Sequence, residues 1–347
     1  MVNKVYAMSS FLQFRSIYTP NTKFSDKMNF PTNYVNIDNE RTQISSSEEL
    51  YTFLKTYIEH KIFDGKAALA LSGGIDSAII AKLMPKGSVA YTFKCVVPGK
   101  NVLDETGKAK QYCEINGLEH KVIEVYWEDY EKYAPVLMKY KSAPIHSIEV
   151  QIYKAALQAK KDGFDKMVFG EMADVVFGGH DGLLSREYTI GEFIDRYSYI
   201  LPYRALKEFV LITEPYKKWC NEDGYMDVHG FNNQYYYYES VNSYINACES
   251  ATIEFVGPFT KTIHSPLNIS RIRGGDSKYL VREVFKRLYP GMEMPHKIPM
   301  PRPTDEWFEE WKGPKRPEFW PNCHVNMTGD QKYYLWILEK FLEEFGI

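Results

Sequence analysis

The sequence contains no apolar run that approaches the roughly 18 residues of a membrane-spanning helix. Its first residues also lack the uninterrupted apolar core of a secretory signal peptide. Cysteine is scarce, and none of the five cysteines forms the Cys-x-x-Cys pair of a zinc or redox site. These absences argue against a membrane protein and a disulfide scaffold. They predict a cytoplasmic protein with free thiols.

The chain also lacks a strong excess of charge of either sign. Its formal net charge is −3 and its pI is about 6.3, which gives no general attraction to nucleic acid. Hydrophobic residues make up 44% of the 347 residues and charged residues 25%, as in ordinary globular proteins with a sizeable core. We therefore expect small-molecule partners and neither nucleic acid nor membrane. Self-association stays open.

From residue 67 onward, short apolar segments alternate with segments of helical spacing. This alternation predicts an α/β fold with a doubly wound parallel sheet and helices on both faces. The expected strands are residues 67–71, 89–97, 120–127 and 166–170, and the first expected helices are residues 77–84 and 104–118.

The remaining patterning divides the chain into three parts. Residues 1–44 read as an N-terminal extension, with irregular structure around residues 19–33. One domain is expected over residues 45–347, with a nucleotide-binding α/β part at 45–185 and a mainly helical part at 186–347. Its first helix should follow a capping box, in which Ser45 and Glu48 have the required spacing.

Two glycines interrupt the pattern where the first strand meets its helix, in the segment Ser72-Gly-Gly-Ile-Asp-Ser77. Glycines let backbone N–H groups approach an anion, and the helix N-terminus adds positive partial charge. The segment is therefore a candidate phosphate cradle, although it has neither the lysine of a Walker A loop nor a Gly-x-Gly-x-x-Gly fingerprint. A carboxylate next to phosphate needs a cation between them, so Asp76 predicts Mg²⁺. The alternative is a simple turn whose Asp and Ser cap a helix.

The segment SGGIDS resembles the pyrophosphate loop of the N-type ATP pyrophosphatases, which cleave ATP to AMP and pyrophosphate. Relatives that make asparagine, GMP, NAD, argininosuccinate or thiolated tRNA share this loop, so it indicates the half-reaction and not the product. The resemblance implies the fold of the adenine-nucleotide α-hydrolases and ATP as the nucleotide. The nucleotide contacts that we expect are Leu71, Ser72, Gly73, Gly74, Asp76, Ser77, Phe93, Gly170 and Lys278.

A second motif, VFGEMADVVFGG at residues 168–179, resembles the asparagine synthetase segment SGEGxDExFGG. It follows a predicted strand, so Asp174 can face the same cleft as Asp76, and the two carboxylates suit Mg²⁺. A solvated loop residue is the alternative for Asp174. The resemblance makes Glu171 a candidate base or orienter for the incoming amine and favours ammonia, because β-lactam-forming relatives have tyrosine there. Met172 and Val175 depart from the family pattern.

Two later stretches extend the resemblance. Residues 253–259 resemble the family's VEARVPF, which places Glu254 at a glutamate that orients or deprotonates the nucleophile. Residues 276–301 resemble the closing K-x-x-L-R…LP…K segment and match Lys278, Arg282 and Lys297. Lys297 is the candidate catalytic cation, because a fixed positive charge stabilises a developing oxyanion. A solvated helix face is the alternative for the other two cations.

Two further features bear on the reaction. His180 follows the Gly-Gly pair of the second motif and is a weaker site candidate, with a structural histidine as the alternative. Glutamine-dependent asparagine synthetases begin with a glutaminase domain whose nucleophilic cysteine directly follows the initiator methionine. Here Val2 follows Met1 and the first cysteine is Cys95. We therefore expect the synthetase half alone, and a separate glutaminase subunit stays open as a partner.

The sequence as a whole predicts an ATP-dependent amide-forming ligase that resembles asparagine synthetase. The expected reaction adenylates a substrate carboxylate, releases pyrophosphate and transfers the acyl group to ammonia or another amine. Two alternatives remain: a tRNA- or base-modifying enzyme with the same loop, and a nucleotide-binding subunit without turnover. The carboxylate itself is not identified by the sequence.

Overall fold

A five-stranded parallel sheet forms the centre of the molecule in the computed structural model, which describes residues 1–19, 21–32, 41–296, 298 and 300–347. Its strands lie in the order β4-β3-β2-β5-β6. They are β2 (Ala67–Ala70), β3 (Val89–Cys95), β4 (Glu119–Val125), β5 (Lys166–Val168) and β6 (Glu254–Val256). A separate two-stranded parallel pair joins β1 (Thr42–Gln43) to β7 (Thr262–Ile263).

Helices cover both faces of the sheet, as predicted for a doubly wound α/β fold. One face carries α2 (Ser47–Ile62), α3 (Ile75–Leu83), α4 (Thr106–Asn116) and α14 (Tyr279–Leu288). The other carries α5 (Trp127–Lys141), α6 (Glu149–Lys161) and α12 (Asn242–Ser250).

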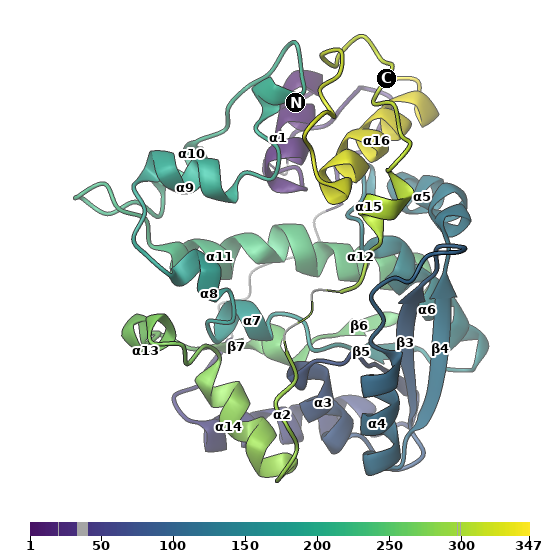
Figure 1. The fold of residues 1–347 in the computed structure, drawn as a ribbon, viewed down its shortest axis with the longest axis vertical. Coiled ribbons are helices and arrows are strands. Elements are labelled where there is room, and N and C mark those ends of the chain that lie inside the picture. Colours follow the sequence, from purple (N-terminus) through teal and green to yellow (C-terminus); the bar gives the residue numbers. More distant parts are fainter. Residues whose placement is uncertain (20, 33–40, 297, 299) are drawn as a thin grey trace.

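The longest helical segment crosses the middle of the molecule (Figure 1). It consists of α11 (Val228–Tyr236), a π-helical turn at Tyr237–Val241, and α12. Above it in the figure lie α1 (Lys4–Phe14) and α16 (Gly329–Glu344). The remaining short elements are α7 (Ala173–Val176), α8 (Asp181–Leu184), α9 (Ile190–Tyr197), α10 (Glu214–Lys217), α13 (Ile269–Arg273), α15 (Thr304–Trp307) and two 3₁₀ turns at Pro202–Arg204 and Pro258–Lys261.

The strand order places a topological switch point between β2 and β5. The chain leaves β2 toward β3 and β4 on one side, then returns to add β5 on the other side. In open parallel sheets, ligands bind at the carboxyl ends of strands beside such a point. The loops that follow β2 and β5 therefore face one crevice, and these are the two segments that carry the predicted motifs.

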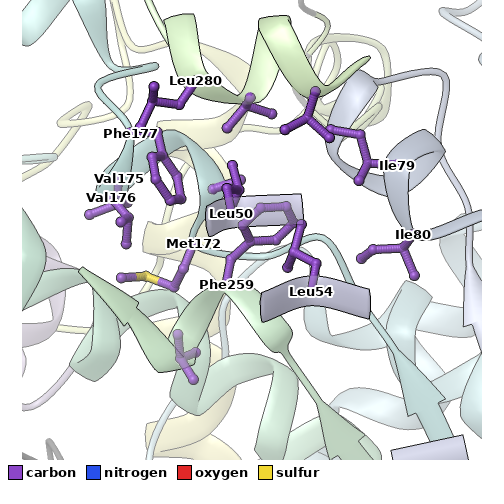
Figure 2. Packing of buried hydrophobic residues seen from close by; sticks show 14 of the residues in the cluster. Leu50, Leu54, Ile79, Ile80, Met172, Val175, Val176, Phe177, Phe259 and Leu280 are labelled. Atoms are coloured by element: carbon purple, nitrogen blue, oxygen red, sulfur yellow. The ribbon is translucent and has the colours of Figure 1, made fainter. Parts of the chain in front are cut away.

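The face that carries α2, α3 and α14 is packed by one large apolar cluster (Figure 2). Leu50 and Leu54, one turn apart on α2, are fully buried, so they form the contact surface of this helix. Ile79 and Ile80 of α3 and Leu280 of α14 belong to the same cluster. This packing holds the start of α3, and hence the glycine loop, against the start of α14.

The N-terminus of α2 differs by one residue from the predicted capping box. Ser46, and not Ser45, is the N-cap residue, and its hydroxyl accepts a hydrogen bond from the Glu49 N–H at 3.2 Å. The Glu49 carboxylate accepts one from the Ser45 N–H at 2.7 Å. The Glu49 carboxylate thus bonds the residue before the N-cap and not the N-cap itself, so a serine N-cap takes the place of the predicted capping box.

The outer parts of the chain depart further from the sequence expectations. Residues 4–14 form the buried helix α1, which the sequence analysis did not anticipate, whereas the irregular structure around residues 21–32 agrees with it. Residues 254–256 are an edge strand where no strand was expected, and residues 205–212 are irregular rather than helical. The predicted boundary at residue 185, between a nucleotide-binding part and a mainly helical part of residues 45–347, stays a prediction.

All five cysteines are free. Within the described residues, no helix is both long and apolar enough to span a bilayer.

Candidate functional site

A cavity of about 490 Å³ lies at the carboxyl ends of β2, β3 and β5 and is closed on one side by the start of α14. Its walls come from the glycine loop after β2, the segment after β5, and residues of α12 and α14. The predicted nucleotide contacts that line it are Leu71, Ser72, Gly74, Asp76, Ser77, Phe93, Gly170 and Lys278. Segments far apart in the sequence thus meet in one concave site of the size that small-molecule pockets have.

Hydrogen bonds to the serine hydroxyl groups fix the conformation of the glycine loop. The Ser77 Oγ accepts a hydrogen bond from the Ser72 N–H at 3.1 Å and lies 3.0 Å from the Ser72 Oγ. The Gly74 N–H donates to the Ser72 Oγ at 3.1 Å. Gly74 is the N-cap residue of α3, so the positive end of this helix points at the cavity. The loop combines backbone amides, hydroxyls and a helix N-terminus, which together suit a phosphate group.

The loop and the segment after β5 are in direct contact at Gly170. A Cβ atom on Gly170 would lie 3.0 Å from the Asp76 Cβ and 3.0 Å from the Ser77 backbone nitrogen. Contacts of 3.0 Å are tighter than nine in ten that real Cβ atoms make, so a side chain here would require the start of α3 to give by a few tenths of an ångström. Glycine at this position therefore allows the two motifs to adjoin without a shift.

Three charged side chains meet where the two motifs adjoin. The Lys278 ammonium lies 2.6 Å from both Asp76 carboxylate oxygens and 3.0 Å from the Asp174 Oδ1. Lys278 is buried, with 7% of its surface exposed. Burial by itself lowers the pKa of Lys278, but the attraction of Asp76 and Asp174 outweighs it and leaves the pKa above its usual value. The two carboxylates are thus aimed at one point, and a positive charge occupies it.

This donor set fits a divalent cation bound together with phosphate. Among the described residues, no group of three or more His, Cys, Asp or Glu side chains is placed to hold a metal ion alone. Mg²⁺ is usually held by one or two carboxylates, with phosphate oxygens and waters completing its shell. Asp76 and Asp174 could supply the two carboxylates.

Glu171 lines the same cavity. Burial raises the pKa of its carboxyl to about 7, and the neighbouring carboxylates of Asp174 and Glu239 act in the same direction. Hydrogen bonds from Ser240, at 2.8 Å, and from Tyr244 oppose the rise. A carboxyl with a pKa near 7 can take up and release a proton under physiological conditions, which suits a general base.

The structure also adds residues that the sequence analysis missed. Glu105 is buried at the start of α4, lines the cavity and accepts a hydrogen bond from the Gly73 N–H at 3.3 Å. Glu105 lies between β3 and α4, at the same edge of the sheet as the two motifs, and this position in the sequence could have identified it as a site residue. Ser240 and Tyr244 come from the π-helical turn and α12, about 70 residues after the second motif, and no local pattern marks them.

Not every predicted site residue lies at this cavity. Glu254 is a correction: it sits at the amino end of β6, is half-exposed and forms an ion pair with Lys61 at 3.0 Å. Parallel strands present their amino ends away from the carboxyl-end crevice, so Glu254 does not line the cavity. Lys297 lies outside the described residues. Arg282 lines the cavity, and the ring of His180 packs against Tyr236 at 4.8 Å between centroids.

The site segments fall largely within the region that known sequences resemble. The family model for asparagine synthase matches residues 52–247. No curated protein matches the chain.

Two solved structures show remote similarity to the chain. The NMN synthetase from Francisella tularensis has 12% identity over 74% of this chain and 99% of that chain, with a TM-score of 0.29. The NH3-dependent NAD synthetase from Campylobacter jejuni has 14% identity over 74% and 100%, with a TM-score of 0.27.

Proposed function

We propose that the chain, which belongs to the asparagine synthase family, joins a carboxylic acid to ammonia at the expense of ATP. Membership of this family supports the activity of an ATP-dependent amidating synthetase of the pyrophosphate-loop type. The products are an amide, AMP and pyrophosphate. One observation carries the proposal: within such a family, the loop amides, Asp76, Asp174 and Lys278 converge on a single cavity at the switch point of the sheet.

In the proposed first step, a carboxylate oxygen of the substrate attacks the α-phosphorus of ATP. The bond between the α-phosphorus and its bridging oxygen breaks, giving an acyl-adenylate and pyrophosphate. The amides of Gly73 and Gly74 and the N-terminus of α3 bind the departing pyrophosphate. Mg²⁺ held by Asp76 and Asp174 would neutralise phosphate charge, and Lys278 adds a buried cation beside it.

In the proposed second step, the nitrogen of ammonia attacks the acyl carbonyl carbon and AMP leaves. Glu171 accepts the proton that the nitrogen loses. Its position in the cavity and its pKa of about 7 support this role, because a general base works best when its pKa is near the operating pH. Lys297 remains our proposed cation for the developing negative charge, on the resemblance of residues 276–301 to the closing motif of the asparagine synthetases.

The proposal extends to partners and compartment. The substrates are a small carboxylic acid and ammonia, the latter free or delivered by a separate glutaminase. Nothing in the charge of the chain favours a nucleic-acid partner. Five free thiols favour a reducing compartment such as the cytoplasm.

The test is an assay of pyrophosphate, AMP and amide with ATP, Mg²⁺, ammonium and a panel of carboxylic acids. We expect at least one acid to release pyrophosphate and AMP in equal amounts, with amide formed in the same amount. Exchange of labelled pyrophosphate into ATP should require the acid and not ammonium, because it reports the first step alone. If AMP release requires tRNA instead, the chain is a tRNA-modifying enzyme. ATP binding without turnover on any acid would favour a non-catalytic subunit.

A further inference from the structure

Glu105 is a buried acid at the pyrophosphate loop that the proposed reaction does not use. It immediately precedes α4, only 7% of its surface is exposed, and its side chain lines the cavity. The carboxyl end of β3 delivers it to the edge of the sheet where the glycine loop lies. A buried carboxyl group in a site meant for a polyanion calls for a physical role, since two neighbouring negative charges repel.

The contact between Glu105 and the loop is specific. Its Oε1 accepts the Gly73 N–H at 3.3 Å, and a Cβ atom on Gly73 would lie 3.2 Å from the same oxygen. The carboxylate therefore occupies one of the amides that pyrophosphate would use. An ionised Glu105 and a pyrophosphate oxygen cannot both accept from that N–H without direct repulsion.

The charges around Glu105 do not offset that repulsion fully. Its neighbour Asp104 is negative and pairs with Lys94 at 3.5 Å on β3. Lys108, the next cation on α4, directs its ammonium to Gln111 at 3.1 Å. On the α3 side the loop carries the Asp76 carboxylate, which lines the same cavity.

Across the cavity, α14 contributes the cations Lys278 and Arg282. The first of these is already committed to Asp76 and Asp174. Burial raises the pKa of Glu105 to about 7, with Asp104 adding to the rise and the Gly73 N–H opposing it. A bound polyanion would raise this pKa further.

We propose that Glu105 is a proton-linked ligand for pyrophosphate. In the ligand-free protein its carboxylate holds the Gly73 N–H. When pyrophosphate binds, the carboxyl takes one proton from solvent, releases the amide and donates its O–H to a pyrophosphate oxygen. No other bond forms or breaks. This inference rests on the proposed function, because it assumes that the glycine loop binds the diphosphate part of ATP.

Titration calorimetry of the full-length protein with inorganic pyrophosphate and Mg²⁺ tests the inference, in buffers that differ in ionisation enthalpy. At pH 8, we expect the wild type to take up more protons per pyrophosphate than Glu105→Gln, whose side-chain amide is a permanently neutral donor. The difference between the two proteins removes the protonation of pyrophosphate itself. Asp104→Asn is the matched control, because it removes the adjacent negative charge while an Asn side chain can still cap α4; it should keep the uptake.

Affinity gives a second readout. About one pH unit above the pKa, only about a tenth of Glu105 is protonated, so a need for the proton weakens wild-type binding about tenfold. Glu105→Gln should therefore bind pyrophosphate about tenfold more tightly than the wild type at pH 8 and about equally at pH 6. If Glu105→Gln does not fold, as judged by thermal melting, Glu105→Ala replaces it for the uptake measurement and should likewise lose the uptake.

Two contrary outcomes distinguish failure of this inference from failure of the proposed function. If Glu105→Gln binds pyrophosphate more weakly at both pH values and takes up as many protons as the wild type, Glu105 only supports the loop and this inference is wrong. If the wild type binds neither pyrophosphate nor ATP, the proposed function fails and the inference fails with it.

Discussion

At the scale of single residues, the site depends on charges that compensate one another. Lys278 lies between two carboxylates that would otherwise repel, and burial strengthens both the attraction and the repulsion. In the proposed function, Asp76 and Asp174 would hold Mg²⁺ and Lys278 would contact a phosphate oxygen. Removing a single member of this group should therefore affect binding and catalysis together.

We predict that Asp76→Asn lowers pyrophosphate release by about 100-fold or more and raises the Mg²⁺ concentration needed for half-maximal activity at least about tenfold. The reason is that an amide oxygen replaces a charged ligand. Initial rates measured over a Mg²⁺ series check this. Asp181→Asn, which removes an exposed carboxylate from the rim of the same cavity, should leave the Mg²⁺ requirement unchanged. Wild-type rates for Asp76→Asn would refute the metal assignment.

The ionisation of Glu171 gives a pH-dependent prediction. Its neutral form cannot accept a proton, and burial places its pKa at about 7. The rate of the ammonia-dependent step should therefore fall as pH decreases below about 7, at a constant concentration of free ammonia.

Glu171→Gln should lose this inflection and most amide formation, while acid-dependent exchange of pyrophosphate into ATP continues. Rapid-quench measurement of amide against pH gives the result. The assignment of Glu171 fails if the variant keeps the wild-type pH profile.

At the scale of elements, the site is a junction between two strand-to-helix turns. Gly170, directly after β5, touches Asp76 and Ser77 at the start of α3, and this contact sets the distance between the two motifs. The sequence predicted both turns, because each short apolar strand is followed by glycine and by an acid. It could not predict how closely they approach, since the approach depends on the pairing of β2 with β5.

Gly170→Ala tests this junction. The added methyl group would push the segment after β5 and the loop apart by a few tenths of an ångström. Since a misplacement of about 1 Å at a reacting centre can lower kcat/KM by about 100-fold, this smaller shift should lower it by about tenfold. We expect such a loss in steady-state assays, with the fold retained by circular dichroism.

Gly107→Ala is the matched control for Gly170→Ala. Gly107 lies in α4 with open space around it, so the change should leave activity unaltered and stabilise the protein by about 0.4–1 kcal/mol. Equal activities for the two variants would show that the junction does not position the site.

At the scale of the whole molecule, buried charges connect the first helix to the middle of the fold. Arg15 follows α1 and forms an ion pair with Glu239 in the π-helical turn, and His146 lies 3.5 Å from the same carboxylate. The Arg15 guanidinium also stacks on Tyr199, 4.5 Å from the ring centroid. The same turn supplies Ser240 to Glu171, so the N-terminal helix and the candidate site share one support.

Arg15→Met should destabilise the protein by about 3–5 kcal/mol, because it leaves the Glu239 carboxylate buried without its cation. Urea unfolding measures the change. Adding Glu239→Leu to the variant should recover part of the loss, since the unpaired charge is then gone.

An exposed ion pair serves as the control for the buried one. Arg287→Met breaks the pair between Arg287 and Glu48 at the surface and should cost less than about 1 kcal/mol. Similar losses for Arg15→Met and Arg287→Met would mean that the buried pair does not connect α1 to the fold.

The sequence by itself determined the local features of this protein. Alternating apolar segments and helical stripes predicted the parallel sheet, and the spacing of Ser72, Gly73, Gly74 and Asp76 predicted a phosphate loop, because both depend on residues close together in the chain. The helix α1, the edge strand β6 and the irregular region at 205–212 escaped prediction, since tertiary contacts decide such segments.

Only the tertiary structure decided which residues share the cavity. It brought Lys278 between Asp76 and Asp174, added Glu105 and Tyr244, and placed Glu254 away from the crevice. The physical reason is the strand order. Whether a residue lines the site depends on which strand it follows and on which side of β2 that strand pairs. Neither property is encoded in a local motif.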